Sequence, residues 1–174
     1  MEKMRLITLI HTCKAYESSR ASVVAQSWVG NSPNVFFVSD ADSDLVNSIN
    51  LGFRPSGPTY HPLTLLRMFD LFIEEFVDYD WLFVVDDDSY CVLPKIEAYL
   101  SFFDPSDCLM IGDFLNWPKH VDGHAADYQS WVGGGSGIIF SRSAVNRFIC
   151  YAGSRDGSKL PWVNHDVWLH RLMV

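Results

Sequence analysis

The fold of this chain is decided by the stretch Trp81-Leu82-Phe83-Val84-Val85-Asp86-Asp87-Asp88-Ser89-Tyr90. Its apolar residues run directly into consecutive carboxylates, which predicts a buried strand with acidic side chains at its carboxyl end. If the extended path continues, Asp86 and Asp88 project to one side and Asp87 to the other, because side chains alternate across a strand. Ligands bind at this end of the strands in open α/β sheets, and carboxylate oxygens suit Mg²⁺ or Mn²⁺. The stretch therefore indicates metal-held phosphate, and the alternative is a polar turn in which Asp88 or Ser89 caps the next helix.

Length and composition are typical of one globular domain. The 174 residues can bury about 70% of the surface of the unfolded chain. The 13 Lys and Arg against 21 Asp and Glu give a formal net charge of −8, without a basic cluster. A phosphate backbone would be repelled, so we expect no nucleic-acid partner. The four cysteines are widely spaced and form no C-x-x-C pair, which gives no support to a zinc site and leaves disulfides open.

Strand and helix patterns alternate along the chain, which predicts an α/β sandwich with a largely parallel sheet. The apolar run at residues 6–10 is too short for a signal peptide, and no stretch approaches the roughly 18 apolar residues that cross a bilayer, so we expect no membrane segment. Residues 114–130 lack periodicity and are expected to form a surface loop. We expect strands over residues 5–12, 34–38, 81–85, 108–111 and 137–140, and helices over 17–28, 44–50, 63–77, 94–103, 143–150 and 166–172.

Two further segments carry candidate site residues. The run Gly133-Gly134-Gly135-Ser136-Gly137 follows Trp131, so a backbone there can approach a ligand closely while the indole stacks on a sugar ring. A glycine-rich turn into a strand explains the run almost as well. Asp166 stands where a polar loop enters a helix, and capping of that helix is as good an interpretation as chemistry.

Taken together, these motifs resemble the Fringe-like glycosyltransferases, the β-1,3-glycosyltransferase group that includes Fringe and the core 1 galactosyltransferases. The resemblance covers nearly the whole chain. Residues 11–29 and 35–40 resemble the family's first β-α-β unit, and residues 79–90 match its metal motif. Residues 131–141 resemble its Gly-Gly-Ala-Gly segment, and residues 165–167 occupy the place of its acidic pair, whose second member is the catalytic base.

The resemblance implies a GT-A-type nucleotide-sugar transferase fold and inverting transfer from a UDP-hexose or UDP-N-acetylhexosamine to a glycan or glycoprotein acceptor. Mn²⁺ or Mg²⁺ would be held by Asp88, assisted by Asp86, and Asp166 would be the general base. Asp87 would support the ribose or the neighbouring loop. The residues implied to bind the nucleotide or the sugar are Thr12, Arg20, Asp40, Asp86, Asp87, Trp131, Gly133, Gly134 and Gly135.

The resemblance also leaves alternatives open. The family usually supplies a metal-binding His well downstream of the base, whereas this sequence ends at Val174 and His170 lies too close to Asp166. We therefore expect a single domain over residues 1–174, and it would be a fragment lacking the end of the catalytic domain, an atypical soluble member or the product of an incomplete gene model. Family members reside in the Golgi or secretory lumen. The rival functions are a UDP-sugar or glycan-binding pseudoenzyme and a phosphatase that uses Asp86 as nucleophile and Asp88 as acid.

Overall fold

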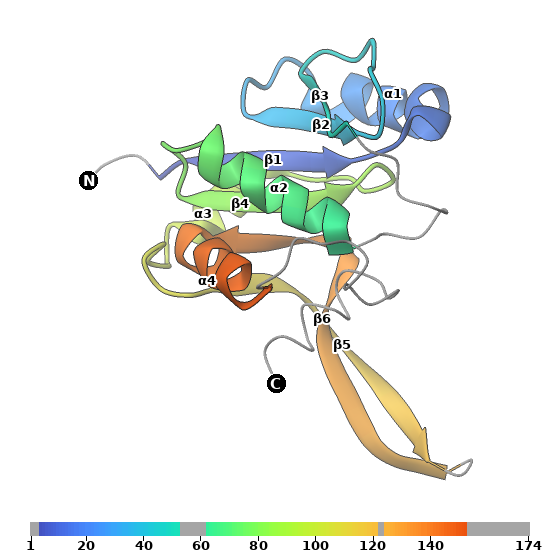
Figure 1. Ribbon diagram of the computed structural model, residues 1–174, viewed down its shortest axis with the longest axis vertical. Helices are drawn as coiled ribbons and strands as arrows, with labels where there is room; N and C mark the ends of the chain where they lie inside the picture. Colours follow the sequence, from blue (N-terminus) through green and yellow to red (C-terminus); the bar gives the residue numbers. More distant parts are fainter. Residues whose placement is uncertain (1–3, 53–61, 122–123, 153–174) are drawn as a thin grey trace.

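One mixed sheet forms the centre of the molecule. The computed structural model describes residues 4–52, 62–121 and 124–152, and within them the sheet has six strands in the order β3-β2-β1-β4-β6-β5 (Figure 1). Strands β1 to β4 run parallel, β6 is antiparallel to β4, and β5 is antiparallel to β6. The predicted α/β class with a largely parallel sheet is confirmed. The strands are β1 (Leu6–His11), β2 (Val35–Ser39), β3 (Ser48–Asn50), β4 (Trp81–Asp86), β5 (Met110–Val121) and β6 (His124–Ser141).

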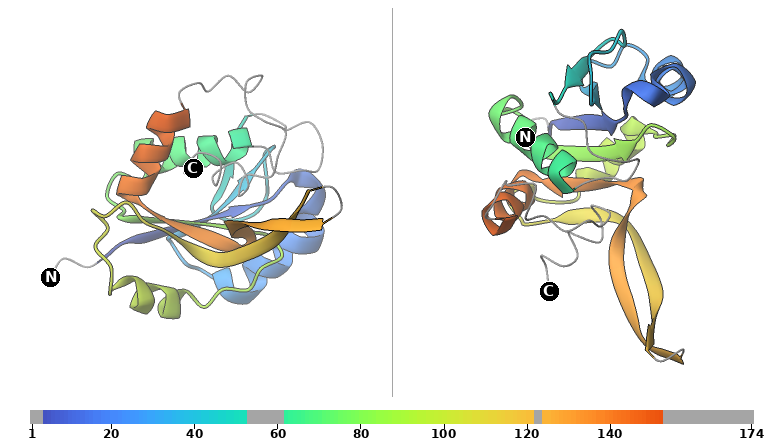
Figure 2. Two further views of the ribbon diagram at one scale, coloured as in Figure 1. Left: turned by 90° about the horizontal axis from the view of Figure 1, so that it is seen from below. Right: turned by 45° about the vertical axis from the view of Figure 1, so that its right-hand side comes forward.

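Helices cover both faces of the sheet (Figure 2). On one face lie α2 (Pro62–Glu74) and α4 (Arg142–Ala152), and on the other lie α3 (Leu93–Leu100) and a helical segment from Lys14 to Val29. That segment consists of η1 (Lys14–Tyr16), η2 (Glu17–Ala21), α1 (Ser22–Val24) and η3 (Ala25–Val29). None of the helices in the described residues has the length and apolar character needed to cross a bilayer.

The central strands β1 and β4 are apolar on both faces because both faces are covered. Ile7 and Leu9 pack with α2 and α4, whereas Leu6 and Ile10 pack with the segment Lys14–Val29 and with α3. Every residue of β4 is buried. A strand in this position is expected to read as a continuous apolar run, which is why β1 and β4 are recognisable in the sequence.

Two predicted elements are wrong. Residues 44–50 do not form a helix: Asn47 has φ of 57°, and the chain enters β3 at Ser48. The Asn47 side-chain amide donates to the carbonyls of Ser32 and Val35, so this residue ties a turn to the start of β2. The expected loop at 114–130 is the β5–β6 hairpin, which extends away from the rest of the sheet (Figure 1).

The start of α4 is fixed by a side-chain cap. Ser141 caps α4, as its position before an apolar segment indicates: its Oγ accepts from the Ala144 N–H at 3.1 Å. The same hydroxyl donates to the Asp107 carbonyl at 2.6 Å.

The four cysteines are all free thiols in the structure, and Cys108 is exposed just before β5 begins.

Candidate active site

Three neighbouring parallel strands end at the same edge of the sheet, and each is followed by a residue that the sequence singled out. Thr12 follows β1, Asp40 follows β2 and Asp87 follows β4. His11 at the end of β1 pairs with Asp86 at the end of β4, so these two strands end level with each other. Ligands of open α/β sheets bind at this edge. The fold therefore gathers polar groups at the edge where a ligand is expected.

The three aspartates differ in their surroundings because the strand ends at Asp86. Asp87 and Asp88 form a turn that the Ser89 N–H closes by donating to the Asp86 carbonyl at 3.2 Å, so the side-chain alternation expected for a longer strand does not extend past Asp86. Asp86 and Asp87 are buried, whereas the Asp88 side chain is 59% exposed. The helix-capping alternative is wrong, since α3 begins after Val92 and has no side-chain cap.

Asp87 faces the protein rather than solvent. Its Oδ2 accepts a 2.7 Å hydrogen bond from the Thr12 hydroxyl, and its Oδ1 lies 3.6 Å from Nη1 of Arg20. Burial raises the pKa of Asp87, while the Thr12 hydroxyl and the Arg20 guanidinium oppose that rise. These contacts join the end of β1, the segment η2 and the end of β4, so Asp87 fixes the shape of the turn.

Arg20 reaches the acidic turn from η2. The same Nη1 atom lies 3.3 Å from Oδ2 of Asp88, and the guanidinium stands over the Tyr16 ring at 4.1 Å from its centroid. Stacking of this kind orients a guanidinium and keeps its edge available to acceptors. Arg20 is thus a positive charge shared by the buried and the exposed carboxylate of the turn.

The glycine run is a bulge in β6. The pairing between β5 and β6 changes from Gly112 opposite Ile138 to Asp113 opposite Gly133, so β6 accommodates the four extra residues 134–137 at one step of β5. Extra residues in one strand bend it and redirect its backbone. The bulge occurs where β6 leaves its pairing with β4, which brings the glycine backbone toward the end of β4.

Ser89 joins this bulge to the acidic turn. Its hydroxyl donates to the Gly135 carbonyl at 2.9 Å, and its own carbonyl accepts at 2.9 Å from the indole N–H of Trp28. Gly133 and Gly134 are buried, while Gly135 is exposed. Local sequence patterns do not predict this role for Ser89 or Trp28, because each hydrogen bond joins residues more than 40 positions apart.

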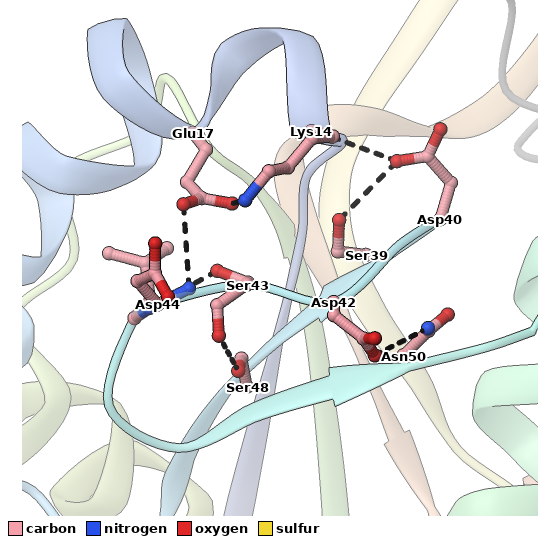
Figure 3. A network of polar contacts seen from close by, with 10 residues as sticks. Lys14, Glu17, Ser39, Asp40, Asp42, Ser43, Asp44, Ser48 and Asn50 are labelled. Atoms are coloured by element: carbon pink, nitrogen blue, oxygen red, sulfur yellow. Dashed lines mark hydrogen bonds and ion pairs between the residues drawn. The ribbon is translucent and has the colours of Figure 1, made fainter.

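Asp40 belongs to a neighbouring polar network (Figure 3). Its Oδ1 accepts from the Lys14 backbone N–H at 2.8 Å, and the Lys14 ammonium donates to Glu17 at 2.9 Å. The hydrogen bond with Glu17 raises the pKa of Lys14 and lowers that of Glu17. In the described contacts Asp40 holds the turn that leaves β1, so it shapes the chain leading to Arg20.

Comparison with known proteins identifies the family. The family model described as Fringe-like matches residues 1–166. This chain belongs to the Fringe-like family. The chain is also similar to the proteins named beta-1,3-glucosyltransferase of Mus musculus and Homo sapiens, with 25% identity over 158 residues in each case. These alignments cover 87% of this chain and 31% and 30% of the two relatives, so the chain spans under a third of their length.

The acidic turn of this Fringe-like domain offers donors suited to a divalent cation shared with phosphate. Within residues 4–52, 62–121 and 124–152, no three Asp, Glu, His or Cys side chains converge as a complete ligand set. Mg²⁺ sites commonly use one or two carboxylates and complete the shell with water and substrate phosphate. Asp88 presents exposed carboxylate oxygens beside the buried Asp86. The two carboxylates therefore fit a divalent cation whose remaining ligands are water and substrate phosphate.

For two predicted site residues, Trp131 and Asp166, the structure describes no side-chain contact with the acidic turn. Asp166 lies outside the described residues, so its role as base stays a prediction. Trp131 pairs through its backbone with Leu115 in the hairpin, two residues before the first glycine of the run. Of the predicted set, the structure brings Thr12, Arg20, Asp87 and Asp88 into direct contact.

Proposed function

We propose that this Fringe-like domain is a glycosyltransferase that moves a hexose or N-acetylhexosamine from a UDP-sugar to a hydroxyl of a glycan or glycoprotein, with inversion at the anomeric carbon. Family membership and the two beta-1,3-glucosyltransferase relatives support the transferase class. The observation that carries the proposal is the meeting of the Asp86–Asp88 turn with the Gly134–Gly137 bulge, through Ser89, at the carboxyl edge of the sheet.

In this proposal Asp88, assisted by Asp86, holds Mn²⁺ or Mg²⁺. The bound cation would neutralise the negative charge that develops on the departing UDP. Asp87 keeps the turn in place through its bond from Thr12, since a buried carboxylate with a hydroxyl donor has little freedom to move. Because Asp87 is held in place, the exposed carboxylate of the adjacent Asp88 would stay in position to bind the cation.

The remaining roles concern the sugar and the acceptor. The backbone of Gly133 to Gly135, with Trp131, would shape the donor sugar pocket, because glycines allow close approach and an indole stacks on sugars. Arg20 would contact the diphosphate, and Thr12 and Asp40 would border the nucleotide. Asp166 would accept the proton of the acceptor hydroxyl as its oxygen attacks the anomeric carbon, a step typically worth about 10²–10⁴-fold.

Titration calorimetry of UDP binding tests the proposal. Wild-type protein should bind UDP in Mn²⁺, and binding should be lost in excess EDTA. Asp88→Asn should weaken UDP binding by about tenfold or more, because a charged oxygen is lost from between protein and cation. The matched control is Asp78→Asn, which neutralises an exposed carboxylate paired with Arg5. Equal UDP affinity in EDTA or in Asp88→Asn contradicts the metal-bridged site.

Two further measurements separate the rival functions. UDP binding with no sugar transfer to any acceptor in a glycan panel would favour the binding pseudoenzyme. Formation of a phosphoenzyme on Asp86 would favour the phosphatase, which needs that carboxylate as a nucleophile.

A further inference from the structure

Arg20 already supplies a positive charge to the carboxylate that we assign to the cation. Its Nη1 atom lies 3.3 Å from Asp88 Oδ2 and 3.6 Å from Asp87 Oδ1. A divalent cation on Asp88 would therefore stand within a few ångströms of a guanidinium, and the two like charges would repel each other. Cation and guanidinium would therefore compete for the negative charge of Asp88.

The two carboxylates that Arg20 contacts differ in how firmly they are held. Asp87 is 2% exposed and accepts a hydrogen bond from Thr12 on Oδ2, the carboxylate oxygen that Arg20 does not contact. Asp88 is 59% exposed and Arg20 is 41% exposed, so their pair is well solvated and easily exchanged. Departure of the guanidinium would leave the turn intact and free Asp88 for another cation.

We propose that Arg20 is an exchangeable counter-ion: it pairs with Asp88 in the empty domain, yields Asp88 to the divalent cation, and moves its guanidinium to the diphosphate of the donor. A diphosphate offers a guanidinium the same paired anionic oxygens that the two carboxylates offer, with stronger, charge-assisted hydrogen bonds. This inference rests on the proposed function. It implies that the cation alone binds weakly and that cation and nucleotide strengthen each other's binding.

The test measures Mn²⁺ binding and UDP binding separately, by calorimetry and by the electron paramagnetic resonance of free Mn²⁺, on the full chain. The variants are Arg20→Ala and Arg20→Gln, which both remove the guanidinium. The matched control is Arg5→Ala, which removes the same charge from an exposed ion pair with Asp78, 3.6 Å long, next to the start of β1. Thermal melting verifies that each variant is folded.

We expect effects of opposite sign at Arg20. Without nucleotide, both Arg20 variants should bind Mn²⁺ at least about threefold tighter than wild type, since the competing ion pair is lost. In saturating Mn²⁺, both should bind UDP about tenfold more weakly, since a charged donor to phosphate is lost. Arg5→Ala should change neither value.

Three results would overturn the inference: Mn²⁺ affinity that is unchanged or lower in the Arg20 variants, an equal gain in Arg5→Ala, or no Mn²⁺ binding by any of the proteins. Failure of the proposed function has a different signature, namely wild-type protein that binds no UDP or binds it equally well in EDTA. The Mn²⁺ measurement alone still judges the competition at Asp88 in that case.

Discussion

Replacing Gly137 with alanine should destabilise the domain because the position has no room for a side chain. Gly137 has φ of 91°, which L side chains rarely adopt. A Cβ atom there would lie 2.4 Å from Cε2 and 2.8 Å from Cζ of Phe83, and 3.1 Å from the carbonyl oxygen of Val84. The Phe83 ring is 3% exposed and packed in the core, so it cannot move aside without disturbing its neighbours.

The magnitude follows from two costs. The positive φ costs an alanine roughly 1–2 kcal/mol, and overpacking a filled core typically costs about 1–3 kcal/mol. The sum is about 2–5 kcal/mol, a large part of the roughly 5–15 kcal/mol by which domains are stable. At about 2–4 °C per kcal/mol for a chain of this size, Gly137→Ala should lower Tm by roughly 4–20 °C.

Thermal and urea unfolding, followed by circular dichroism, measure the effect. The control is Gly135→Ala in the same bulge, because a Cβ on Gly135 meets no atom within 4 Å. That variant should stay within about 0.5 kcal/mol of wild type. The reasoning is refuted if Gly137→Ala melts within about 1 °C of wild type, or if Gly135→Ala loses as much stability as Gly137→Ala.

Two further predictions concern the neighbourhood of the acidic turn. Ser89→Ala should weaken UDP-sugar binding several-fold in calorimetry, with a change in unfolding free energy of only about 1 kcal/mol, because the lost 2.9 Å bond to Gly135 positions the bulge; unchanged affinity would contradict this role. Burial raises the pKa of Cys91 to about 11, so its reactive thiolate is about 0.1% populated at pH 8 and grows as pH rises toward 11. Thiol labelling read by mass spectrometry at pH 8 should therefore modify the exposed Cys108 and Cys150 and spare the half-buried Cys91, and rapid labelling of native Cys91 would contradict the raised pKa.

The sequence predicts those elements whose buried faces leave a regular apolar pattern along a single segment. Strands β1 and β4 are covered on both faces and read as largely apolar runs. Helix α2 carries its apolar stripe toward the sheet, and the expected range 63–77 overlaps most of Pro62–Glu74. In each case the apolar residues lie at the positions that face the sheet or the helices that cover it.

The wrong predictions concern segments whose structure depends on residues far away in the sequence. The β5–β6 hairpin is held by pairing between strands, which leaves no periodicity in residues 114–130. Strand β3 has only three residues at the sheet edge, and its approach depends on the Asn47 turn rather than on apolar spacing. At the site, the expected alternation of Asp86, Asp87 and Asp88 ends because the strand does, and a strand end is set by tertiary contacts.

Core packing and site geometry are therefore coupled in this domain. Phe83 in β4 approaches Gly137 so closely that only glycine fits, and the backbone of Gly137 begins the return of the bulge to the sheet. The bulge in turn presents the Gly135 carbonyl to Ser89, the residue after Asp88. A change in the packing of the Phe83 ring should reach the acidic turn through this short chain of contacts. The apolar half of the stretch that starts at Trp81 thus helps to position the carboxylate that its acidic half supplies.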